Sequence, residues 1–264
     1  MTEKIGVIGG SGFGSLLDNA EEVRVNTPYG APSSKLLVGK VGRQEVVFLP
    51  RHGNEHQLPP HKIPYRANIY ALKELGIGKI ITATAVGSVQ KKIKPGDFVI
   101  IDQFVNWTKN RADTFYDGPI TTHISTAFPY CGQLNRHAYK TAKKLKIKSH
   151  LGGAIVVIEG PRFSTAAESL FFTKMGWDIV NMTQYPEVAL AREMGLCYCA
   201  LALVTDYDAG VIKKEGLKPV STKEVIKVFG ENNQQAAKLI TKMISELPKK
   251  TTCDCRKVLE NAAI

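Results

Sequence analysis

The feature that most constrains the fold is an apolar run, Ala200–Val204, that ends abruptly in the polar segment Thr205–Asp208. Such a run is typical of a strand buried on both faces, although a buried helix segment cannot be told apart by periodicity alone. On a strand, side chains two residues apart point the same way, so Asp206 and Asp208 would project together from its end. Ligands of open α/β sheets bind at the carboxyl ends of strands, which makes this strand end a candidate site.

The two carboxyl groups are expected to influence each other. Like charges on one face repel, and a partly dry pocket raises the cost of ionising both groups, so one carboxyl can keep its proton near neutral pH. A protonated carboxyl can act as a hydrogen-bond donor or as a general acid. The alternatives are an Asp-rich turn, helped by Gly210, that simply ends the strand, and a metal-binding pair.

The size and composition of the chain point to one globular unit. It has 264 residues, of which 44% are hydrophobic and 22% are charged, as in ordinary globular proteins. No repeat, linker or low-complexity stretch divides it, so we expect a single domain over residues 1–264 with a polar tail at about residues 248–264. No apolar run reaches the roughly 18 residues of a membrane helix, and the N-terminus lacks a signal-peptide layout, so we expect a cytoplasmic protein without a membrane partner.

The formal net charge of +11 raises the question of nucleic-acid binding. The lysines, however, are dispersed along the chain, and no basic run with interleaved aromatic residues or known nucleic-acid motif is present. We therefore expect no nucleic-acid partner. A basic protein that handles small phosphates gains the same electrostatic attraction.

The cysteines predict no metal site. The chain has five, at Cys131, Cys197, Cys199, Cys253 and Cys255. Neither close pair has the C-x-x-C spacing typical of zinc sites. Cys197 and Cys199 stand at the start of the apolar strand and are expected to be core thiols. Cys253 and Cys255 lie in the polar tail, where a short disulfide and free thiols both remain open.

Apolar segments separated by turn residues predict an α/β fold with a central mixed, twisted sheet flanked by helices. The early strands pair as a hairpin around Gly42-Arg43, which excludes a purely parallel sheet. Besides the first strand and the Ala200–Val204 strand, we expect strands at Glu22–Val25, Lys35–Val41, Gln44–Leu49, Lys79–Thr84, Phe98–Phe104, Gly153–Ile158 and Asp178–Met182. The expected helices are Ala67–Leu75, Arg136–Leu145, Ser164–Lys174, Pro186–Met194 and Val225–Leu247.

Several strand ends carry groups suited to a phosphate. After the first strand, three glycines and the Ser11 hydroxyl can form an anion-binding nest, although a plain tight turn fits equally well. Arg51 and His52 follow another strand, where the planar guanidinium suits phosphate, although both residue types are also common in surface loops. Thr84 adds a hydroxyl at a third strand end. The histidines near His52 match no metal-binding helical spacing.

Other strand ends suit a purine nucleoside. A protonated aspartic acid, the aromatic ring of Phe163 and the side chain of Met182 beside Thr183 are suited to a purine and its ribose. Together with a phosphate site, an acid that assists a leaving base indicates phosphorolysis. The reaction would pass through an oxocarbenium-like state, as in glycoside hydrolysis.

These segments together resemble the trimeric purine nucleoside phosphorylase family, in its 5′-methylthioadenosine phosphorylase branch. The resemblance covers roughly Lys4–Leu247. It rests on the motifs I-G-G-S-G, L-P-R-H-G, N-E-H…P-P-H-K-I-P-Y-R-A-N, D-Q-F-V-N-W-T-K-N-R…F-Y-D-G-P, I-E-G-P-R-F-S-T, N-M-T-Q-Y-P-E and T-D-Y-D, in this order. The resemblance implies a single-domain phosphorylase with a central mixed sheet, assembled as a homotrimer or a dimer of trimers.

The resemblance also implies roles for individual residues. Phosphate would be held by Ser11, Arg51, His52, Thr84, Ala85 and Thr183. The nucleoside would contact Phe163, Met182, Asp206, Asp208, His123, Thr222, Val225 and Ile226. In this set His123 would reach into the site of a neighbouring subunit, and the last three residues would line the methylthio pocket.

The implied reaction is phosphate-dependent cleavage of 5′-methylthioadenosine, and of adenosine, to adenine and a 5-substituted ribose 1-phosphate, as in purine and methionine salvage. Asp206 would protonate the leaving base at N7, and Asp208 would accept a hydrogen bond from the 6-amino group. Inorganic phosphate is the co-substrate, and no metal or organic cofactor is implied. The alternative is a broad-specificity purine nucleoside phosphorylase that also accepts inosine and guanosine.

This sequence departs from the family pattern in a few places. Ser11 replaces a frequent threonine, and the segment Ala209–Pro219 matches only loosely, which leaves the base and 5′ selectivity open. The C-x-C near the C-terminus, with Cys131 and Cys197 at positions matching a bridged pair, resembles thermophilic archaeal members. That resemblance implies intrachain disulfides.

Overall fold

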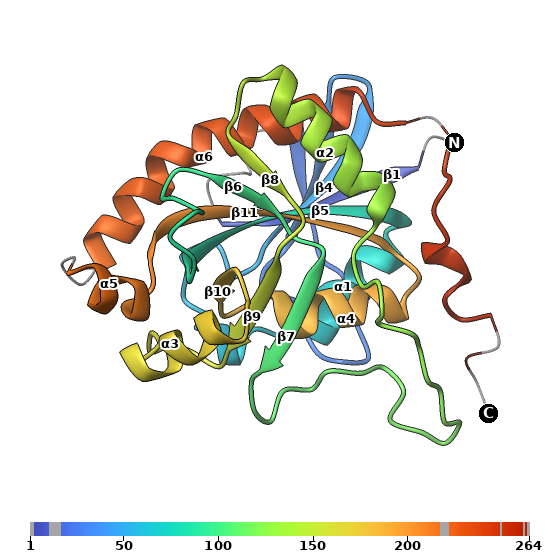
Figure 1. The fold of residues 1–264 in the computed structure, drawn as a ribbon. Helices are drawn as coiled ribbons and strands as arrows, with labels where there is room; N and C mark the ends of the chain where they lie inside the picture. The colour runs from blue at the N-terminus through green and yellow to red at the C-terminus, as the bar shows by residue number, and fades with distance from the viewer. Residues whose placement is uncertain (1–2, 11–16, 217–221, 249, 261, 263–264) are drawn as a thin grey trace.

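One long strand, β5 (Ile77–Ser88), holds the central sheet together in the computed structural model (Figure 1). It pairs in parallel with β1 (Lys4–Gly9) on one side and with β11 (Cys197–Tyr207) on the other. Its last two residues then pair antiparallel with β10 (Ile179–Asn181). Because β5 contributes to every branch of the sheet, all of these strand ends are held at fixed distances from it.

The structure describes residues 3–10, 17–216, 222–248, 250–260 and 262. Within this part of the chain the sheet has 11 strands. Its main path runs β2-β3-β4-β1-β5-β10-β9-β7, and a branch leads from β5 through β11 and β6 to β8. Parallel and antiparallel pairs are both present, as the mixed-sheet prediction requires.

The predicted hairpin around Gly42 is confirmed. The strands β3 (Leu36–Val41) and β4 (Gln44–Pro50) pair antiparallel, and Gly42 adopts a positive φ of 60° in the turn between them. A left-handed conformation of this kind costs glycine little, because glycine has no Cβ. The strand β2 (Asp18–Val23) adds to the outer side of β3 and forms one edge of the sheet.

The single strand predicted at Phe98–Phe104 is wrong. The segment forms two strands, β6 (Phe98–Ile100) and β7 (Gln103–Trp107), that belong to different branches of the sheet. The first pairs with β11 and with β8 (Ser149–Leu151), whereas the second pairs with β9 (Ala154–Ile158). Continuous apolar character could not reveal this break, because both strands are extended and the chain changes partners within two residues.

Helices cover both faces of the sheet (Figure 1). They are α1 (Tyr65–Glu74), α2 (Gly132–Lys144), α3 (Ala166–Lys174), α4 (Gln184–Glu193), α5 (Ala209–Glu215) and α6 (Thr222–Ser245), with short 3-10 helices at Pro60–Lys62 and Cys255–Lys257. The predicted helices correspond to the five longest of these, whereas α5 occupies a segment predicted only as loosely matching the family. None of the described helices has the length and apolarity needed to cross a bilayer.

The strand β11 is buried on both faces, as its apolar run predicts. Leu201 and Leu203 pack in a core with α2 and α6, whereas Tyr198 and Ala202 face a second core formed with α1 and α4. Alternate side chains of one strand therefore enter two different cores. This double burial anchors the strand that ends in Asp206 and Asp208.

The cysteines do not follow the disulfide expectation. All five are free thiols, and the implied Cys131–Cys197 bridge is not formed. Instead, the Sγ atom of Cys197 lies 3.4 Å from that of Cys253 in the C-terminal tail. Cys197 and Cys199 are both buried in the core, as predicted.

Candidate active site

A cavity of about 760 Å³ opens where the carboxyl ends of several strands meet. Residues at the ends of β5, β10 and β11, and residues just after β4, β10 and β11, reach it, and Phe163 lines it from the loop after β9. The residues singled out from the sequence that line this cavity are Arg51, His52, Thr84, Ala85, Phe163, Met182, Thr183, Asp206 and Asp208. Residues from distant parts of the chain thus meet in one place.

Arg51 is held at the cavity floor by a buried ion pair. Its Nε atom donates to Glu187 Oε2 at 2.7 Å, and its Nη2 atom donates to Oε1 of the same carboxylate at 3.0 Å. Arg51 Nη2 also donates to the Thr82 hydroxyl, and Nη1 donates to the Ala83 carbonyl at 3.2 Å. Both partners of the pair are almost completely buried.

This arrangement limits what Arg51 can offer a ligand. A guanidinium has five N–H donors, and four are used by these contacts, so one Nη1 hydrogen remains for the cavity. Burial by itself would lower the pKa of Arg51, but the adjacent Glu187 carboxylate raises it above its ordinary value. The cation is therefore permanent, while Glu187 offsets much of its charge. Glu187 was not singled out from the sequence, although the motif N-M-T-Q-Y-P-E contains it.

His52 is neutral at physiological pH. Burial and the neighbouring Arg51 cation lower its pKa to about 4. Its Nδ1 atom lies 2.8 Å from the Leu58 carbonyl, which can only accept, so the proton is assigned to Nδ1. Nε2 is then left with a lone pair and can accept a hydrogen bond from a ligand hydroxyl.

Hydroxyls and an amide form a second polar group on the floor. Asn181 Nδ2 lies 3.1 Å from Thr84 Oγ1 and 3.3 Å from Thr183 Oγ1, and the two hydroxyls lie 3.4 Å apart. Thr183 precedes α4 and makes no side-chain capping bond, so its hydroxyl is not committed to the helix. Sequence reasoning missed Asn181, because an asparagine at a strand end has many structural uses and only its motif neighbours suggested a site.

A register shift aims the two aspartates. The pairing of β11 with β5 shifts between Val204 and Asp206, which places a bulge at Thr205. Bulges bend a strand and re-aim the side chains that follow. A Cβ on Gly87 would lie 3.4 Å from Asp206 Oδ2 and 3.5 Å from Asp208 Cβ, so both residues lie against this glycine.

Burial makes ionisation of Asp206 and Asp208 less favourable in this position. Burial raises the pKa of Asp206 to about 6, against a lowering by the hydrogen bond from Thr205, and the nearby Asp208 raises it further. Burial also raises the pKa of Asp208, against a lowering by hydrogen bonding to the Ser169 and Ser164 hydroxyls and the Ala209 backbone. One carboxyl group can therefore carry a proton close to neutral pH while the other acts as a hydrogen-bond acceptor.

Arg111 joins two segments that carry residues of the cavity. It comes from the long loop after β7, and its guanidinium donates to the carbonyls of Met182 at 3.0 Å and Glu159 at 2.8 Å. These bonds join the segment after β10 to the loop that carries Phe163. Gly160, with a φ of 68°, lets its own loop approach the Met182 side chain closely, because a Cβ at this position would lie 2.6 Å from the Met182 sulfur. Arg111 was not singled out from the sequence.

Some predicted site residues are not brought to this cavity. His123 is exposed on the long loop, where its amide donates to the Ala262 carbonyl at 2.9 Å. Ser11 falls outside the described residues. Thr222, Val225 and Ile226 belong to the first turns of α6, and their side chains are also outside the described part.

Comparisons with known proteins agree with this arrangement. The sequence model of the phosphorylase superfamily matches residues 4–245. The S-methyl-5′-thioadenosine phosphorylase of Thermococcus kodakarensis is 49% identical over 97% of this chain and 98% of its own length. A purine nucleoside phosphorylase of Streptomyces coelicolor is 46% identical over 96% of this chain and 92% of its own. The structure of Schistosoma mansoni methylthioadenosine phosphorylase in complex with adenine superposes with a TM-score of 0.92 at 34% identity, covering 99% of each chain.

The buried ion pair of Arg51 and Glu187 predicts that loss of the Glu187 charge strongly destabilises the fold. Replacing Glu187 by Gln leaves the Arg51 charge uncompensated in the core, which should lower the free energy of unfolding by about 3–5 kcal/mol. The matched change Glu246→Gln removes a solvent-exposed carboxylate that pairs with Lys144 and Lys242, and it should have a much smaller effect. Urea unfolding of both variants measures the difference. Equal losses would contradict the role assigned to Glu187.

The raised pKa of Asp206 predicts that the stability of the protein depends on pH. Its folded pKa of about 6 lies above the ordinary value of 3.8, so the native state binds this proton more tightly than the unfolded chain. The contribution to stability is therefore fully present below about pH 4 and is lost as the pH rises to about 6, by on the order of 2–3 kcal/mol. The difference in unfolding free energy between the wild type and Asp206→Asn should show this loss. The variant Asp18→Asn, at an exposed position, should keep the wild-type profile, and an identical profile for Asp206→Asn would contradict the assignment.

Proposed function

Because the chain belongs to the phosphorylase superfamily, we propose that it cleaves 5′-methylthioadenosine, and adenosine, with inorganic phosphate. The products are adenine and 5-methylthioribose 1-phosphate or ribose 1-phosphate, which links the reaction to purine and methionine salvage. The observation that carries the proposal is the meeting of a buried carboxyl of raised pKa with a hydroxyl-lined floor in one cavity.

Phosphate binds on the floor formed by Arg51, Thr84, Ala85 and Thr183, with Ser11 as a further hydroxyl donor. Since Glu187 offsets the Arg51 charge, neutral hydroxyl and amide donors supply much of the binding. The hydroxyls of Thr84 and Thr183 are 3.4 Å apart, close enough to serve one ligand together. His52, protonated on Nδ1, accepts a hydrogen bond at Nε2 from a protonated phosphate oxygen or from a ribose hydroxyl.

The nucleoside lies between the floor and the aspartates. Phe163 and Met182 supply the apolar contacts for the base and ribose, and Asp208 accepts a hydrogen bond from the 6-amino group. Asp208 lines the cavity, and a carboxylate has acceptor sites for this bond besides those used by the nearby serine hydroxyls. Thr222, Val225 and Ile226 line the pocket for the 5′ substituent in this proposal.

The chemical step moves one proton and one bonding pair. A phosphate oxygen attacks C1′ of the ribose from the face opposite the base, and the N9–C1′ bond breaks with its electron pair passing to the purine. Asp206 gives its proton to N7, so that adenine leaves as a neutral molecule, and C1′ inverts. Positioning and electrostatic stabilisation supply most of the acceleration, with no organic cofactor or metal taking part in the proposed step.

A broader purine nucleoside phosphorylase is the second candidate. The similarity to the Streptomyces coelicolor purine nucleoside phosphorylase supports it. An ionised Asp208 would face the carbonyl oxygen of a 6-oxopurine, and two acceptors repel each other, which favours 6-aminopurines. The paired aspartates thus favour the first candidate.

A substrate panel tests the proposal. With phosphate present, release of base from methylthioadenosine should exceed release from inosine, and Asp206→Asn should lose about 10²–10⁴-fold in kcat because general acid catalysis is removed. Near-wild-type circular dichroism would show that the variant folds. Release of hypoxanthine from inosine far faster than release of adenine would favour the second candidate, and phosphate-independent release would contradict phosphorolysis.

We also infer a homotrimer or a dimer of trimers, in the cytoplasm. The loop of residues 108–131 exposes Ile120 and Phe128 to 61% and 77%, and the exposed Trp107 and Phe171 rings pack against each other at a tilted angle. Apolar surface of this kind marks interaction sites. His123 lies on the same loop and contributes to the site of a neighbouring subunit in this proposal.

Light scattering during size-exclusion chromatography measures the assembly. The expected mass is about three or six times the 29.0 kDa of one chain. His123→Ala should raise the KM for methylthioadenosine more than it lowers kcat, because it acts at the 5′ end of the substrate. A monomer with full activity would contradict the shared site.

A further inference from the structure

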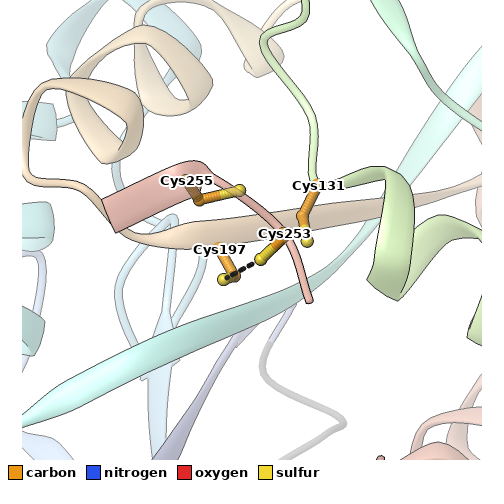
Figure 2. Close-up of side chains that lie close together, drawn as sticks. All are labelled: Cys131, Cys197, Cys253 and Cys255. Carbon is orange, nitrogen blue, oxygen red and sulfur yellow. Dashed lines mark hydrogen bonds between the residues drawn. The ribbon is translucent and has the colours of Figure 1, made fainter. Parts of the chain in front are cut away.

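We propose that Cys131, Cys197, Cys253 and Cys255 form a structural zinc site, in which four thiolates hold one Zn²⁺ ion. Figure 2 shows the four side chains converging from three separate segments. Cys131 directly precedes α2, Cys197 begins β11, and the other two lie in the C-terminal tail. We refer to these four residues as the cysteine cluster.

The spacing of the sulfur atoms fits a tetrahedral ion. All four Sγ atoms lie within 4.8 Å of one another, and the pair Cys197–Cys253 is 3.4 Å apart. A tetrahedral site with Zn–S bonds of about 2.3 Å places its sulfur atoms about 3.8 Å apart. A disulfide would instead require one pair at about 2.05 Å, and no pair of cysteines is bonded. One central ion would hold all four sulfur atoms at similar distances from one another, whereas two disulfides would bring the sulfur atoms together only in pairs.

The chemistry of the donor set selects the metal. Four thiolates in tetrahedral geometry favour zinc or iron over harder cations, and structural zinc sites are closed sites with four protein ligands. The cluster is closed in this sense, because Cys131, Cys197 and Cys255 are buried and Cys253 is partly buried. Binding replaces four S–H bonds by four Zn–S bonds and releases the four thiol protons to solvent.

The surroundings can carry the negative charge that remains on four thiolates around one divalent ion. Cys131 is the N-cap residue of the 13-residue helix α2, and the positive end of a helix dipole stabilises a nearby anion. Arg136 lies close to Gly132, the residue after Cys131, in the first turns of α2. The helix dipole and this cation would therefore partly balance the charge.

The site would fasten the C-terminal tail to the core. Two of its ligands belong to the tail and two to the body of the protein, and Gln133 already hydrogen-bonds the tail at Lys250 and Thr252. Farther along the tail, the Ala262 carbonyl accepts a hydrogen bond from the His123 amide. Fixing the tail therefore also supports the loop that carries His123. The cluster itself is remote from the reaction, since Cys197 and Asp206 stand near opposite ends of β11, about 30 Å apart along an extended strand.

The experiment measures zinc in the full-length protein. The chain is purified under a phosphine reductant, given zinc chloride in slight excess and desalted, and its metal content is determined by mass spectrometry. The wild type should retain about one zinc per chain, and cobalt in place of zinc should give the intense visible bands of a tetrahedral four-thiolate site. The double variant Cys253→Ser/Cys255→Ser should lose both signals and unfold at a lower temperature.

Cys199→Ser is the matched control, because Cys199 is buried in the same core but lies outside the cluster. It should retain zinc and the cobalt spectrum. Failure of the reduced wild type to retain zinc would overturn the proposal, as would zinc retention by the double variant. Disulfides among the four cysteines in protein isolated without reductant, found by mass spectrometry of a non-reduced digest, would also overturn it. Because the readout is metal content, these results are independent of whether the proposed phosphorolysis is correct.

Discussion

The buried pair of Arg51 and Glu187 is the interaction on which the site depends. It joins residues 136 positions apart, and it ties the end of β4 to α4. Arg51 also bonds two residues of β5, and the Tyr198 hydroxyl of β11 donates to the same Glu187 carboxylate at 2.6 Å. The pair thus ties β4, β5 and β11 to α4. A buried charge without this partner would be strongly destabilising, so the geometry of the floor and the stability of the core are coupled.

The same pair explains how the site can bind an anion without a strong net charge. Glu187 offsets the arginine, and burial keeps His52 neutral. In the proposed reaction, directional donors such as the Thr84 and Thr183 hydroxyls position the phosphate. Burial also raises the pKa of Asp206 in the same cavity, which in this proposal keeps a proton available for the leaving base. Burial thus disfavours the charged form of both His52 and Asp206: it keeps His52 neutral and favours the protonated form of Asp206.

Much of the fold follows from local sequence patterns. The hairpin of β3 and β4, the long helices and the doubly buried strand β11 were predictable, because periodicity and turn residues are local properties. The split of the Phe98–Phe104 segment was not predictable, because strand partners are chosen by distant residues. Glu187 and Arg111 were missed for the same reason: an acid in a helix and an arginine in a loop acquire meaning only through their partners.

For the site, the sequence by itself determined the chemistry that is available: two carboxyls after a core strand, hydroxyls and an arginine at other strand ends, and the ordered motifs of a phosphorylase. Only the tertiary structure decided how these groups act. The bulge at Thr205 aims the carboxyls, Glu187 occupies two of the five Arg51 donors, and the tail cysteines meet Cys131 and Cys197. The physical reason is that residue type and spacing act along the chain, whereas burial, charge pairing and ligand geometry depend on distances through space.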